Sequence, residues 1–360
     1  MELFEAMTID GHEEVLFGVD KVSGLKTIIA IHSTALGPAL GGTRFYPYDS
    51  EEAALRDVLR LSRGMTFKSA SAGLDLGGGK AVIMGDPRKA KSERVLRAYG
   101  KWVDSLAGRY ITAEDVGTEL EDMSVIRRET KWVVGLPLEE NGSGDPSPFT
   151  ARGVLAAMRA TAQELWGSDD LAGKTVAIQG VGKVGISLVE QLVEVGAKPI
   201  VADVRSDAVA DAVRDYGATA VEHDDILATA CDILAPCALG GILNPDTIPE
   251  LKCSAIVGSA NNQLLKGADA QLMADRDILY CPDFVANAGG VINVAEELHG
   301  YSKARAVRAV DAIYTNTRSV FDAARNDGVN PHIAAKAAAE RRIHEIGTLR
   351  LTRRGGIDVH

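Results

Sequence analysis

The stretch that decides the fold is Thr175-Val176-Ala177-Ile178-Gln179-Gly180-Val181-Gly182-Lys183-Val184-Gly185. Its first five residues predict a buried strand, and three glycines follow at the spacing G-x-G-x-x-G. A helix is expected to continue through Val195 and to end at Gly196, and a second strand, Pro199–Ala202, leads to Asp203. This order of strand, glycine loop, helix, strand and acidic residue is typical of a dinucleotide-binding unit.

Each part of this motif has a physical role in holding a dinucleotide. The glycines permit a tight turn and close approach of the backbone, and the helix N-terminus offers N–H groups and its dipole to the pyrophosphate. The carboxylate of Asp203 would accept hydrogen bonds from the ribose hydroxyls and repel a 2′-phosphate, which favours NAD, although Arg205 nearby weakens that preference. A glycine turn without a ligand is the alternative. The loop residues expected to contact the cofactor are Gly180, Val181, Gly182, Lys183, Val184 and Gly185.

Three later segments are expected in the same domain. Ile233–Ala238 and Ala255–Asn262 each run from an apolar strand into small and polar residues. Ligands of open α/β sheets bind at the carboxyl ends of strands, so Asn261 and Asn262 are expected to meet a ligand, with a simple turn as the alternative. Asp283–Val294 is rich in small residues and is compatible with close packing on the cofactor.

Two lysines mark the N-terminal part of the chain. Three glycines, Gly77–Gly79, are expected to form a turn before Lys80, which opens the apolar run Ala81–Met84 of a buried strand. A helix is expected to begin at Asp49 as its N-cap, and its apolar face continues to Lys68. Both amines should therefore be partly desolvated. The alternative is that Lys68 extends to solvent while Lys80 pairs with a structural carboxylate.

The remaining pattern indicates two domains. Before residue 145, strands are expected at Lys26–His32 and Arg109–Thr112, with a turn-rich segment at Gly37–Arg44. The segment Glu139–Pro148 is rich in Gly, Pro, Ser and Asn and is the best candidate for a linker. Beyond it strands and helices alternate, which is typical of a parallel sheet. After about residue 301 only helices are expected, and the last ten residues are expected to be disordered.

The composition excludes several classes of function. The formal net charge of the 360 residues is −11, which argues against a nucleic-acid or anionic-membrane surface. No apolar run approaches the ~20 residues of a membrane span, and the acidic N-terminus lacks the layout of a signal peptide. Four widely spaced cysteines form no C-x-x-C pair, so we expect small buried hydrophobes rather than a disulfide framework or a metal site. A reducing, cytoplasmic location fits this pattern.

Five motifs in order resemble a known family. They are Gly37–Arg44, Leu76–Lys80, Thr112–Gly117, Gly258–Asn262 and Asn287–Val291. Together they are similar to the Glu/Leu/Phe/Val dehydrogenases over residues 1 to about 345, and most similar to the leucine and valine dehydrogenase branch.

The resemblance implies reversible oxidative deamination of an L-amino acid to its 2-oxo acid and ammonia, with hydride passing to NAD. It implies that Lys80 is the catalytic lysine, that Asp115 is its proton-transfer partner and that Lys68 holds the substrate carboxylate. Further implied contacts are Gly41, Gly42 and Asn262 with the substrate carboxylate, and Thr150, Asn261 and Asn287 with the cofactor.

The chemistry of these residues agrees with that implication. Two ammonium groups in one desolvated site disfavour each other's charge, so one pKa should fall toward neutrality. A neutral Lys80 could then take a proton from the water that attacks the iminium intermediate, while Lys68 stays charged. Asp115 can shuttle protons on the amino group; capping the helix near Glu119 is a weak alternative because the spacing is long.

The substrate pocket implied by alignment consists of Leu40, Ala113, Val291 and Val294, all apolar. Glutamate dehydrogenases carry a lysine where this chain has Leu40, and leucine cannot compensate a buried carboxylate, so glutamate is disfavoured. The pocket favours a branched-chain substrate, leucine first, with valine and isoleucine separated from it by only ~1–3 kcal/mol. The alternatives are a phenylalanine dehydrogenase and a non-catalytic NAD-binding sensor.

The expected architecture is α/β, with two domains around a cleft. Residues 1–145 form an α/β substrate-binding and oligomerisation domain, and residues 146–330 form a Rossmann-type doubly wound NAD domain. The resemblance implies that C-terminal helices at about 330–350 pack back on the first domain. It also implies a homo-oligomer, an octamer or a dimer.

Overall fold

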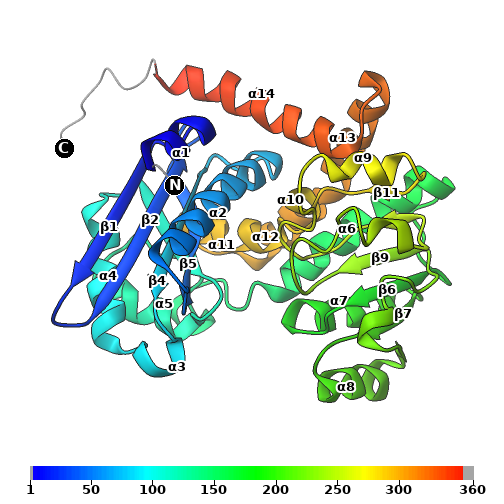
Figure 1. Ribbon diagram of the computed structural model, residues 1–360, viewed down its shortest axis with the longest axis horizontal. Coiled ribbons are helices and arrows are strands. Elements are labelled where there is room, and N and C mark those ends of the chain that lie inside the picture. Colours follow the sequence, from blue (N-terminus) through cyan, green and yellow to red (C-terminus); the bar gives the residue numbers. More distant parts are fainter. Residues whose placement is uncertain (1–2, 352–360) are drawn as a thin grey trace. The chain divides into compact units, whose positions relative to one another are not determined.

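The structure, a computed structural model, describes residues 3–351, which form two compact units (Figure 1). The first unit contains the chain up to Asp145, Val294–Lys303 and the chain from Ala339 onward. The second contains Pro146–Asn293 and Ala304–Ala338. Most of the tail that we expect to be disordered, residues 352–360, lies outside the described residues. No helix in the described part of the chain is long and apolar enough to cross a membrane.

The first unit is built on a five-stranded mixed sheet with the order β1-β2-β4-β3-β5. Its strands are β1 (Glu14–Asp20), β2 (Leu25–Ser33), β3 (Ala39–Tyr46), β4 (Gly77–Met84) and β5 (Tyr110–Glu114). β1 and β4 each pair antiparallel with β2, whereas β3 lies parallel to both β4 and β5. The strands predicted near residues 26–32 and 109–112 are confirmed. The turn-rich segment predicted at residues 37–44 is wrong, because most of it forms β3.

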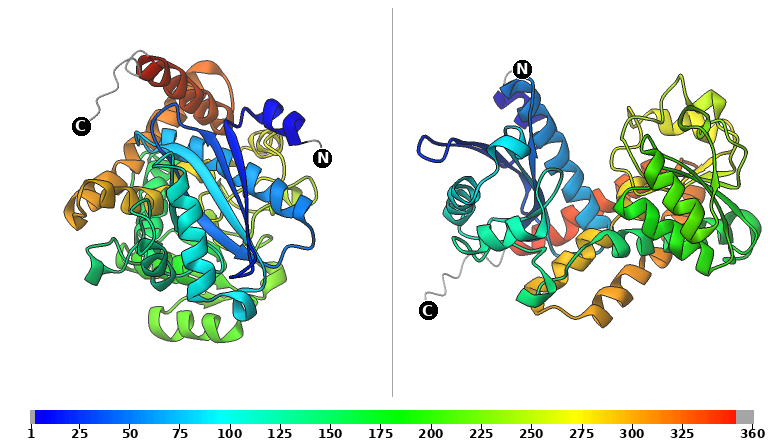
Figure 2. Two further views of the ribbon diagram at one scale, coloured as in Figure 1. Left: turned by 90° about the vertical axis from the view of Figure 1, so that its left-hand side faces the viewer. Right: turned by 90° about the horizontal axis from the view of Figure 1, so that it is seen from below.

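Helices cover both faces of this sheet (Figure 2, right). They are α1 (Leu3–Asp10), α2 (Glu51–Ser71), α3 (Pro87–Ala90), α4 (Glu93–Ser105) and α5 (Leu120–Arg127), with a 3-10 turn, η1 (Leu138–Glu140). The hydroxyl of Ser50, not the predicted Asp49, caps α2 by accepting a hydrogen bond from the backbone N–H of Ala53. The predicted N-cap is therefore wrong by one residue.

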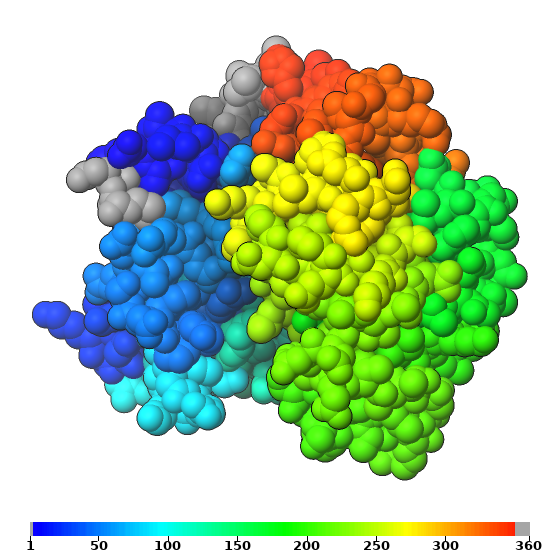
Figure 3. Space-filling view, turned by 45° about the vertical axis from the view of Figure 1, so that its right-hand side comes forward, coloured from blue at the N-terminus to red at the C-terminus, as the bar shows by residue number. Residues whose placement is uncertain are grey.

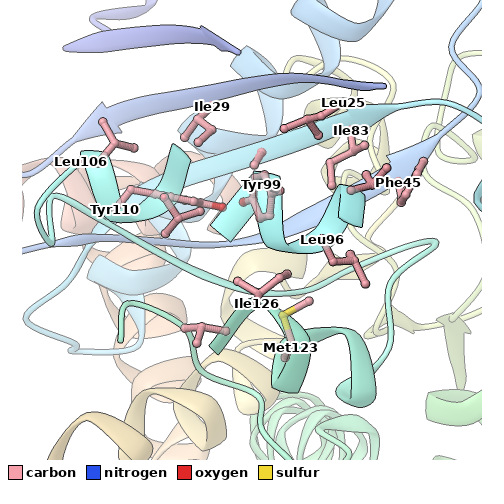
Figure 4. Packing of buried hydrophobic residues seen from close by; sticks show 14 of the residues in the cluster. Leu25, Ile29, Phe45, Ile83, Leu96, Tyr99, Leu106, Tyr110, Met123 and Ile126 are labelled. Carbon is pink, nitrogen blue, oxygen red and sulfur yellow. The ribbon is translucent and has the colours of Figure 1, made fainter. Parts of the chain in front are cut away.

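Alternation along the strands divides their side chains between the two faces of the sheet. Ala39, Phe45, Ala81, Ile83 and Tyr110 lie in the core under α4 and α5 (Figure 4). Successive side chains of a strand point to opposite faces, so the intervening residues face α2. Val82 of β4 packs there against α2. We call this side the α2 face; its positions on β3, β4 and β5 include Leu40, Gly42, Arg44, Gly78, Lys80 and Ala113.

Glycines let β3, β4 and α2 approach one another closely. A Cβ atom at Gly41 would lie 1.8 Å from the carbonyl oxygen of Gly79, and one at Gly78 would lie 2.1 Å from the backbone nitrogen of Thr66 in α2. The glycine triplet predicted as a turn before Lys80 lies within β4, and none of its members has a positive φ. These glycines therefore serve close packing rather than a change of direction.

The second unit contains a six-stranded parallel sheet with the order β11-β10-β9-β6-β7-β8. Its strands are β6 (Thr175–Gln179), β7 (Lys198–Ala202), β8 (Thr219–Ala220), β9 (Ile233–Pro236), β10 (Ala255–Ile256) and β11 (Leu279–Tyr280). The chain starts at the centre with β6, runs outward to β8 and then crosses to β9, which is the doubly wound order. The predicted two-domain α/β fold with a Rossmann-type sheet is confirmed.

Helices also flank this sheet. They are α6 (Ser147–Trp166), α7 (Lys183–Glu194), α8 (Ser206–Tyr216), α9 (Asp269–Ala274), α10 (Asp283–Ala286), α11 (Gly289–Ala295), α12 (Lys303–Asp311), α13 (Ile313–Asp327) and the first part of α14 (Pro331–Leu351), with 3-10 turns η2 (His223–Asp225) and η3 (Ile248–Glu250). A further 3-10 turn, η4 (Glu296–His299), lies in a segment of the first unit. α8 buries only Ala212 and forms the light green surface at the bottom of Figure 3.

Two C-terminal segments belong to the first unit. The carboxylate of Glu297 accepts hydrogen bonds from the backbone N–H groups of Gly135 and Ser143, which attaches Val294–Lys303 to that unit. The second half of α14 packs through Ala339 against Leu36 and Ala70. The boundaries expected from the sequence did not include Val294–Lys303, because this attachment depends on one side chain binding two backbone amides far away in the chain.

A substitution at Gly78 tests the close packing of α2 on β4. Gly78→Ala places a methyl group against backbone atoms, so we expect a loss of about 1–3 kcal/mol in the free energy of unfolding. Gly64→Ala is the matched control: it lies within α2 with no atom within 4 Å of its Cβ position, and it should stabilise by about 0.5–1 kcal/mol. Urea unfolding followed by circular dichroism measures both changes. Equal stability of the two variants would contradict the packing argument.

Candidate functional site

A buried amine paired with a carboxylate lies on the α2 face of the first unit. Lys80 lies in β4 and is only 5% exposed. Its Nζ donates a hydrogen bond to Oδ2 of Asp115, which directly follows β5. Alternation explains the encounter, because Lys80 and Asp115 both occupy α2-face positions of strands separated only by β3.

The surroundings of Lys80 disfavour its charged form. Burial is the largest cause of a pKa well below the usual range for lysine, and the positive charges of Arg44 and Lys68 lower that pKa further. The charge of Asp57 in α2 acts in the opposite direction. An amine held near its neutral form inside a protein can act as a base, which an ordinary surface lysine cannot do at neutral pH.

Neighbouring groups also hold the carboxylate of Asp115. Its Oδ1 accepts hydrogen bonds from the backbone N–H of Val116 at 2.6 Å and from Nε of Arg44 at 3.4 Å. Its own backbone N–H donates to the hydroxyl of Thr118 at 2.9 Å. Oδ2 is thereby directed to Lys80, so the pair has one defined orientation.

The backbone at Gly41 and Gly42 adjoins this pair. The ladder between β3 and β4 is interrupted there, between the pairs Leu40↔Gly78 and Thr43↔Ala81. The carbonyl of Gly41 accepts a hydrogen bond of 2.6 Å from the hydroxyl of Tyr110. In a trans peptide the N–H of Gly42 points the opposite way from that carbonyl. A Cβ atom at Gly42 would lie 3.0 Å from Cβ of Asp115, so this peptide lies directly beside the carboxylate.

Two further predicted site residues, Leu40 and Ala113, lie on the same face of the sheet, and Lys68 lies in the helix α2 that packs on it. Lys68 is half-buried near the end of α2, close enough for its charge to act on Lys80. Leu40 and Ala113 are buried on β3 and β5. Val294 belongs to this unit too, and its Cγ1 lies 3.9 Å from the Cβ position of Gly135. Val291 is buried in α11 of the second unit.

The second unit holds the glycine loop at the carboxyl end of β6. Gly180 has φ +97°, which favours glycine, and a Cβ atom at Gly185 would lie 2.0 Å from the Gly180 carbonyl oxygen. Gly182 is the N-cap of α7 and has only open space around its Cβ position. β6 and β9 are the neighbouring strands where the chain direction across the sheet reverses, which is where open α/β sheets bind their ligands.

Asp203 connects the second strand of this motif to the glycine loop. One carboxylate oxygen accepts the backbone N–H of Val181 at 2.8 Å, and the other accepts that of Arg205 at 2.9 Å. The sequence did not indicate these internal bonds. A carboxylate has about four acceptor positions, so Asp203 can still accept hydrogen bonds from ribose hydroxyls.

A group of amides forms at the carboxyl end of β10. Nδ2 of Asn287 donates to the backbone carbonyl of Ser259 at 3.0 Å and to Oδ1 of Asn261 at 3.1 Å. Asn262 adopts a left-handed conformation with φ +52° and accepts the backbone N–H of Gly241, so the turn alternative describes its local structure. Its predicted contact with substrate stays a prediction.

The residues of the second unit fit a dinucleotide. Gly182 leaves space for a phosphate at the start of α7, and no described side chain caps that helix N-terminus. Oδ1 of Asn287 is buried and has no hydrogen-bond partner among the described residues, as expected of an atom that binds a polar ligand. Thr150 adjoins the same region, since its hydroxyl lies 2.6 Å from the Cβ position of Gly290.

Comparison with known families agrees with this geometry. Residues 12–132 match the family model described as Glu/Leu/Phe/Val dehydrogenase, dimerisation domain. Residues 142–213 and 201–348 match the model described as Glutamate/Leucine/Phenylalanine/Valine dehydrogenase. The chain belongs to this family. The resemblance inferred from the five sequence motifs is thereby confirmed.

Three individual proteins of known name are similar to this chain over most of its length. The chain is 55% identical over 343 residues to a leucine dehydrogenase of Geobacillus stearothermophilus, covering 95% of this chain and 94% of the relative. It is 53% identical over 338 residues to a valine dehydrogenase of Streptomyces coelicolor, covering 93% of each. The crystal structure of L-tryptophan dehydrogenase from Nostoc punctiforme is similar with a TM-score of 0.81 and 46% identity, covering 96% of this chain and 99% of that one.

A more distant structure shows the fold alone. The hetero-hexameric glutamate dehydrogenase of Thermus thermophilus is 23% identical, with a TM-score of 0.80, and the match covers 97% of this chain and 95% of that one. The sequence-based alternative was phenylalanine, whereas the aromatic amino acid in the name of the Nostoc punctiforme relative is tryptophan.

The sequence did not indicate two side chains that contact the predicted site residues, nor a third that binds one of these two. Tyr110 binds the Gly41 carbonyl, Arg44 binds Asp115, and Asp57 binds Arg44 at 2.8 Å. For Arg44 the sequence does carry a signal, which is the alternation along β3. As a strand, residues 39–46 place Leu40, Gly42 and Arg44 on one face.

Gly182 tests dinucleotide binding without disturbing the fold. Gly182 has φ −71°, which any residue adopts, and no atom lies within 4 Å of its Cβ position, so Gly182→Val should keep the fold and lose only the small stability expected of valine at an N-cap. The added side chain would occupy the space beside the helix N-terminus that a phosphate needs. We expect NADH affinity, measured by fluorescence titration, to fall at least tenfold. Unchanged affinity would show that the dinucleotide does not bind at this loop.

Proposed function

We propose that this protein catalyses the reversible, NAD-dependent oxidative deamination of a branched-chain L-amino acid, with leucine as the first substrate and valine and isoleucine as further ones. The reaction converts the amino acid, water and NAD⁺ to the 2-oxo acid, ammonium, NADH and a proton. The observation that carries the proposal is the buried pair of Lys80 and Asp115 in a chain 55% identical to a leucine dehydrogenase.

In this proposal the residues of the first unit bind the substrate and move protons. The charged amine of Lys68 and the N–H of Gly42 bind the substrate carboxylate. Neutral Lys80 accepts a proton from the water molecule that attacks the iminium carbon, and Asp115 exchanges protons with the substrate nitrogen. A nicotinamide dinucleotide held by the glycine loop and Asp203 would supply the hydride acceptor for this reaction. Lys80 must be neutral for its step, so activity should rise as the pH passes upward through the pKa of Lys80.

The proposed substrate preference depends on the apolar pocket positions. Leu40 and Ala113 are apolar and buried, and neither can compensate a side-chain carboxylate. Glutamate is therefore disfavoured by the cost of an unpaired charge, while the binding free energies of leucine, valine and isoleucine differ only by small contributions of apolar groups. The tryptophan dehydrogenase relative makes tryptophan the aromatic substrate to test beside phenylalanine.

The choice of NAD, the assembly and the location are parts of the same proposal. Asp203 adjoins the glycine loop, and its negative charge would repel the 2′-phosphate of NADP. Phe17 and Val19, at least half exposed on edge strand β1, support assembly into a homo-oligomer, for which octamer and dimer both stay predictions. The cytoplasmic location also stays a prediction.

A substrate panel tests the proposed function. NADH formation should be fastest with leucine, slower with valine and isoleucine, and at least a hundredfold lower in kcat/KM with glutamate. Phenylalanine and tryptophan belong in the same panel. In a separate comparison, replacing NAD with NADP should reduce kcat/KM for leucine at least tenfold. Faster turnover of either aromatic amino acid than of leucine would contradict the branched-chain proposal.

Removal of the Lys80 amine tests its catalytic role. Lys80→Ala should lower kcat by about 10²- to 10⁴-fold, because the group proposed to take the proton is lost. NADH affinity should stay within about twofold, since the dinucleotide residues lie in the second unit.

Lys91→Ala is the matched control for Lys80→Ala. It breaks another ion pair of the first unit, with Asp122 at 2.8 Å, away from the residues proposed for catalysis. Its kcat should remain near that of the parent protein. Equal losses in the two variants would show that ion-pair removal in general, not loss of a base, lowers the rate.

A further inference from the structure

A chain of polar contacts extends from the amine–carboxylate pair to the half-buried Tyr48. It runs from Lys80 through Asp115, Arg44 and Asp57 to Tyr48. The guanidinium of Arg44 uses Nε for Asp115, at 3.4 Å, and Nη1 for Asp57, at 2.8 Å. The hydroxyl of Tyr48 donates to the same oxygen of Asp57 at 2.6 Å.

The position of Arg44 follows from the fold. It lies on β3, between β4, which carries Lys80, and β5, which Asp115 follows. Its side chain lies on the same face of the sheet as Leu40 and Gly42. Its side chain is 22% exposed, and that of Asp57 is 15% exposed, so water screens these charges only in part. A guanidinium is a planar fork that stays charged, and two carboxylates hold this one from different elements.

We propose that Arg44 is a positioning residue for the Lys80–Asp115 pair: it holds one oxygen of Asp115 and places a fixed positive charge beside the amine, while Asp57 and Tyr48 keep Arg44 in place. This inference rests on the proposed function. It assigns to Arg44 the two conditions that a base at Lys80 requires, a carboxylate with a fixed orientation and an amine that is readily neutral.

The charges around Lys80 predict that its pKa shifts in opposite directions when Arg44 or Asp57 is replaced. Arg44 and Lys68 disfavour its protonated form, whereas Asp57 favours it, and Asp115 pairs with it directly. Removing the charge of Arg44 should therefore raise the pKa of Lys80. Removing the charge of Asp57 should lower it, provided that Arg44 stays in place.

The test is the pH dependence of kcat/KM for leucine with NAD, whose acidic limb reports the loss of the proton from the base. In Arg44→Gln this limb should move to higher pH by about one unit. In Asp57→Asn, where the amide oxygen still accepts from Arg44 and Tyr48, it should move to lower pH. Arg44→Lys retains the positive charge but loses the planar guanidinium that binds both carboxylates. The acidic limb should therefore stay at the same pH, while kcat falls at least tenfold.

Arg60→Gln is the matched control. Arg60 is 65% exposed and approaches the other oxygen of Asp57 at 3.7 Å, and this change should affect neither kcat nor the limb. Circular dichroism and thermal unfolding establish that each variant is folded. An unmoved limb in both Arg44→Gln and Asp57→Asn would overturn the proposal and leave Arg44 with a structural role only.

A second measurement separates this proposal from the proposed function. Trace acetylation with acetic anhydride over a range of pH, read by mass spectrometry of the peptide containing Lys80, follows the protonation of that amine without turnover. If the parent protein forms no NADH with any amino acid, the proposed function is wrong. Arg44→Gln must still shift the acetylation profile upward, and Asp57→Asn must shift it downward, or the inference fails as well.

Discussion

The close contact between the backbones of β3 and β4 is the constraint on which the first unit depends. The Cβ position of Gly41 lies 1.8 Å from a backbone oxygen of Gly79, so no other residue fits unless the strands separate. This contact leaves the Gly41 carbonyl to Tyr110, places Lys80 beside Asp115 and lets α2 approach β4 at Gly78. A single separation of the two strands would disturb the peptide at Gly41, the buried amine and the helix that carries Lys68.

Strand alternation explains how a buried amine is tolerated in this sheet. Apolar burial stabilises both faces, because Tyr99, Tyr110 and Phe45 lie in the core on one side and Val82 packs against α2 on the other. The α2 face also carries the charged groups, which pair with one another across three strands and α2. The large cost of burying Lys80 alone is thus reduced by Asp115, and the core on the opposite face is free of charge.

The sequence predicted the second unit more accurately than the first, because the interacting residues of the dinucleotide motif are close together in the chain, whereas those of the first unit are far apart. The residues of the dinucleotide motif lie within thirty positions of one another, so their spacing alone indicates strand, loop and helix. The glycines near residues 40 and 78 have meaning only through contacts between distant strands, and local turn preference gave the wrong structure for both. For the same reason, the internal bonds of Asp203, the attachment of Val294–Lys303 by Glu297 and the role of Tyr110 could not be predicted.

The error at residues 37–44 also explains why Arg44 went unassigned. Within a turn an arginine has no defined neighbours, and its natural interpretation is solvent contact. Within β3 it shares a face with Leu40 and Gly42, and both neighbouring strands bring a charged group to it: Lys80 from β4 and Asp115 just after β5. A positive charge in that position acts on the protonation of an amine that it does not touch. The chemistry of Lys80 therefore belongs to the sheet as much as to the lysine.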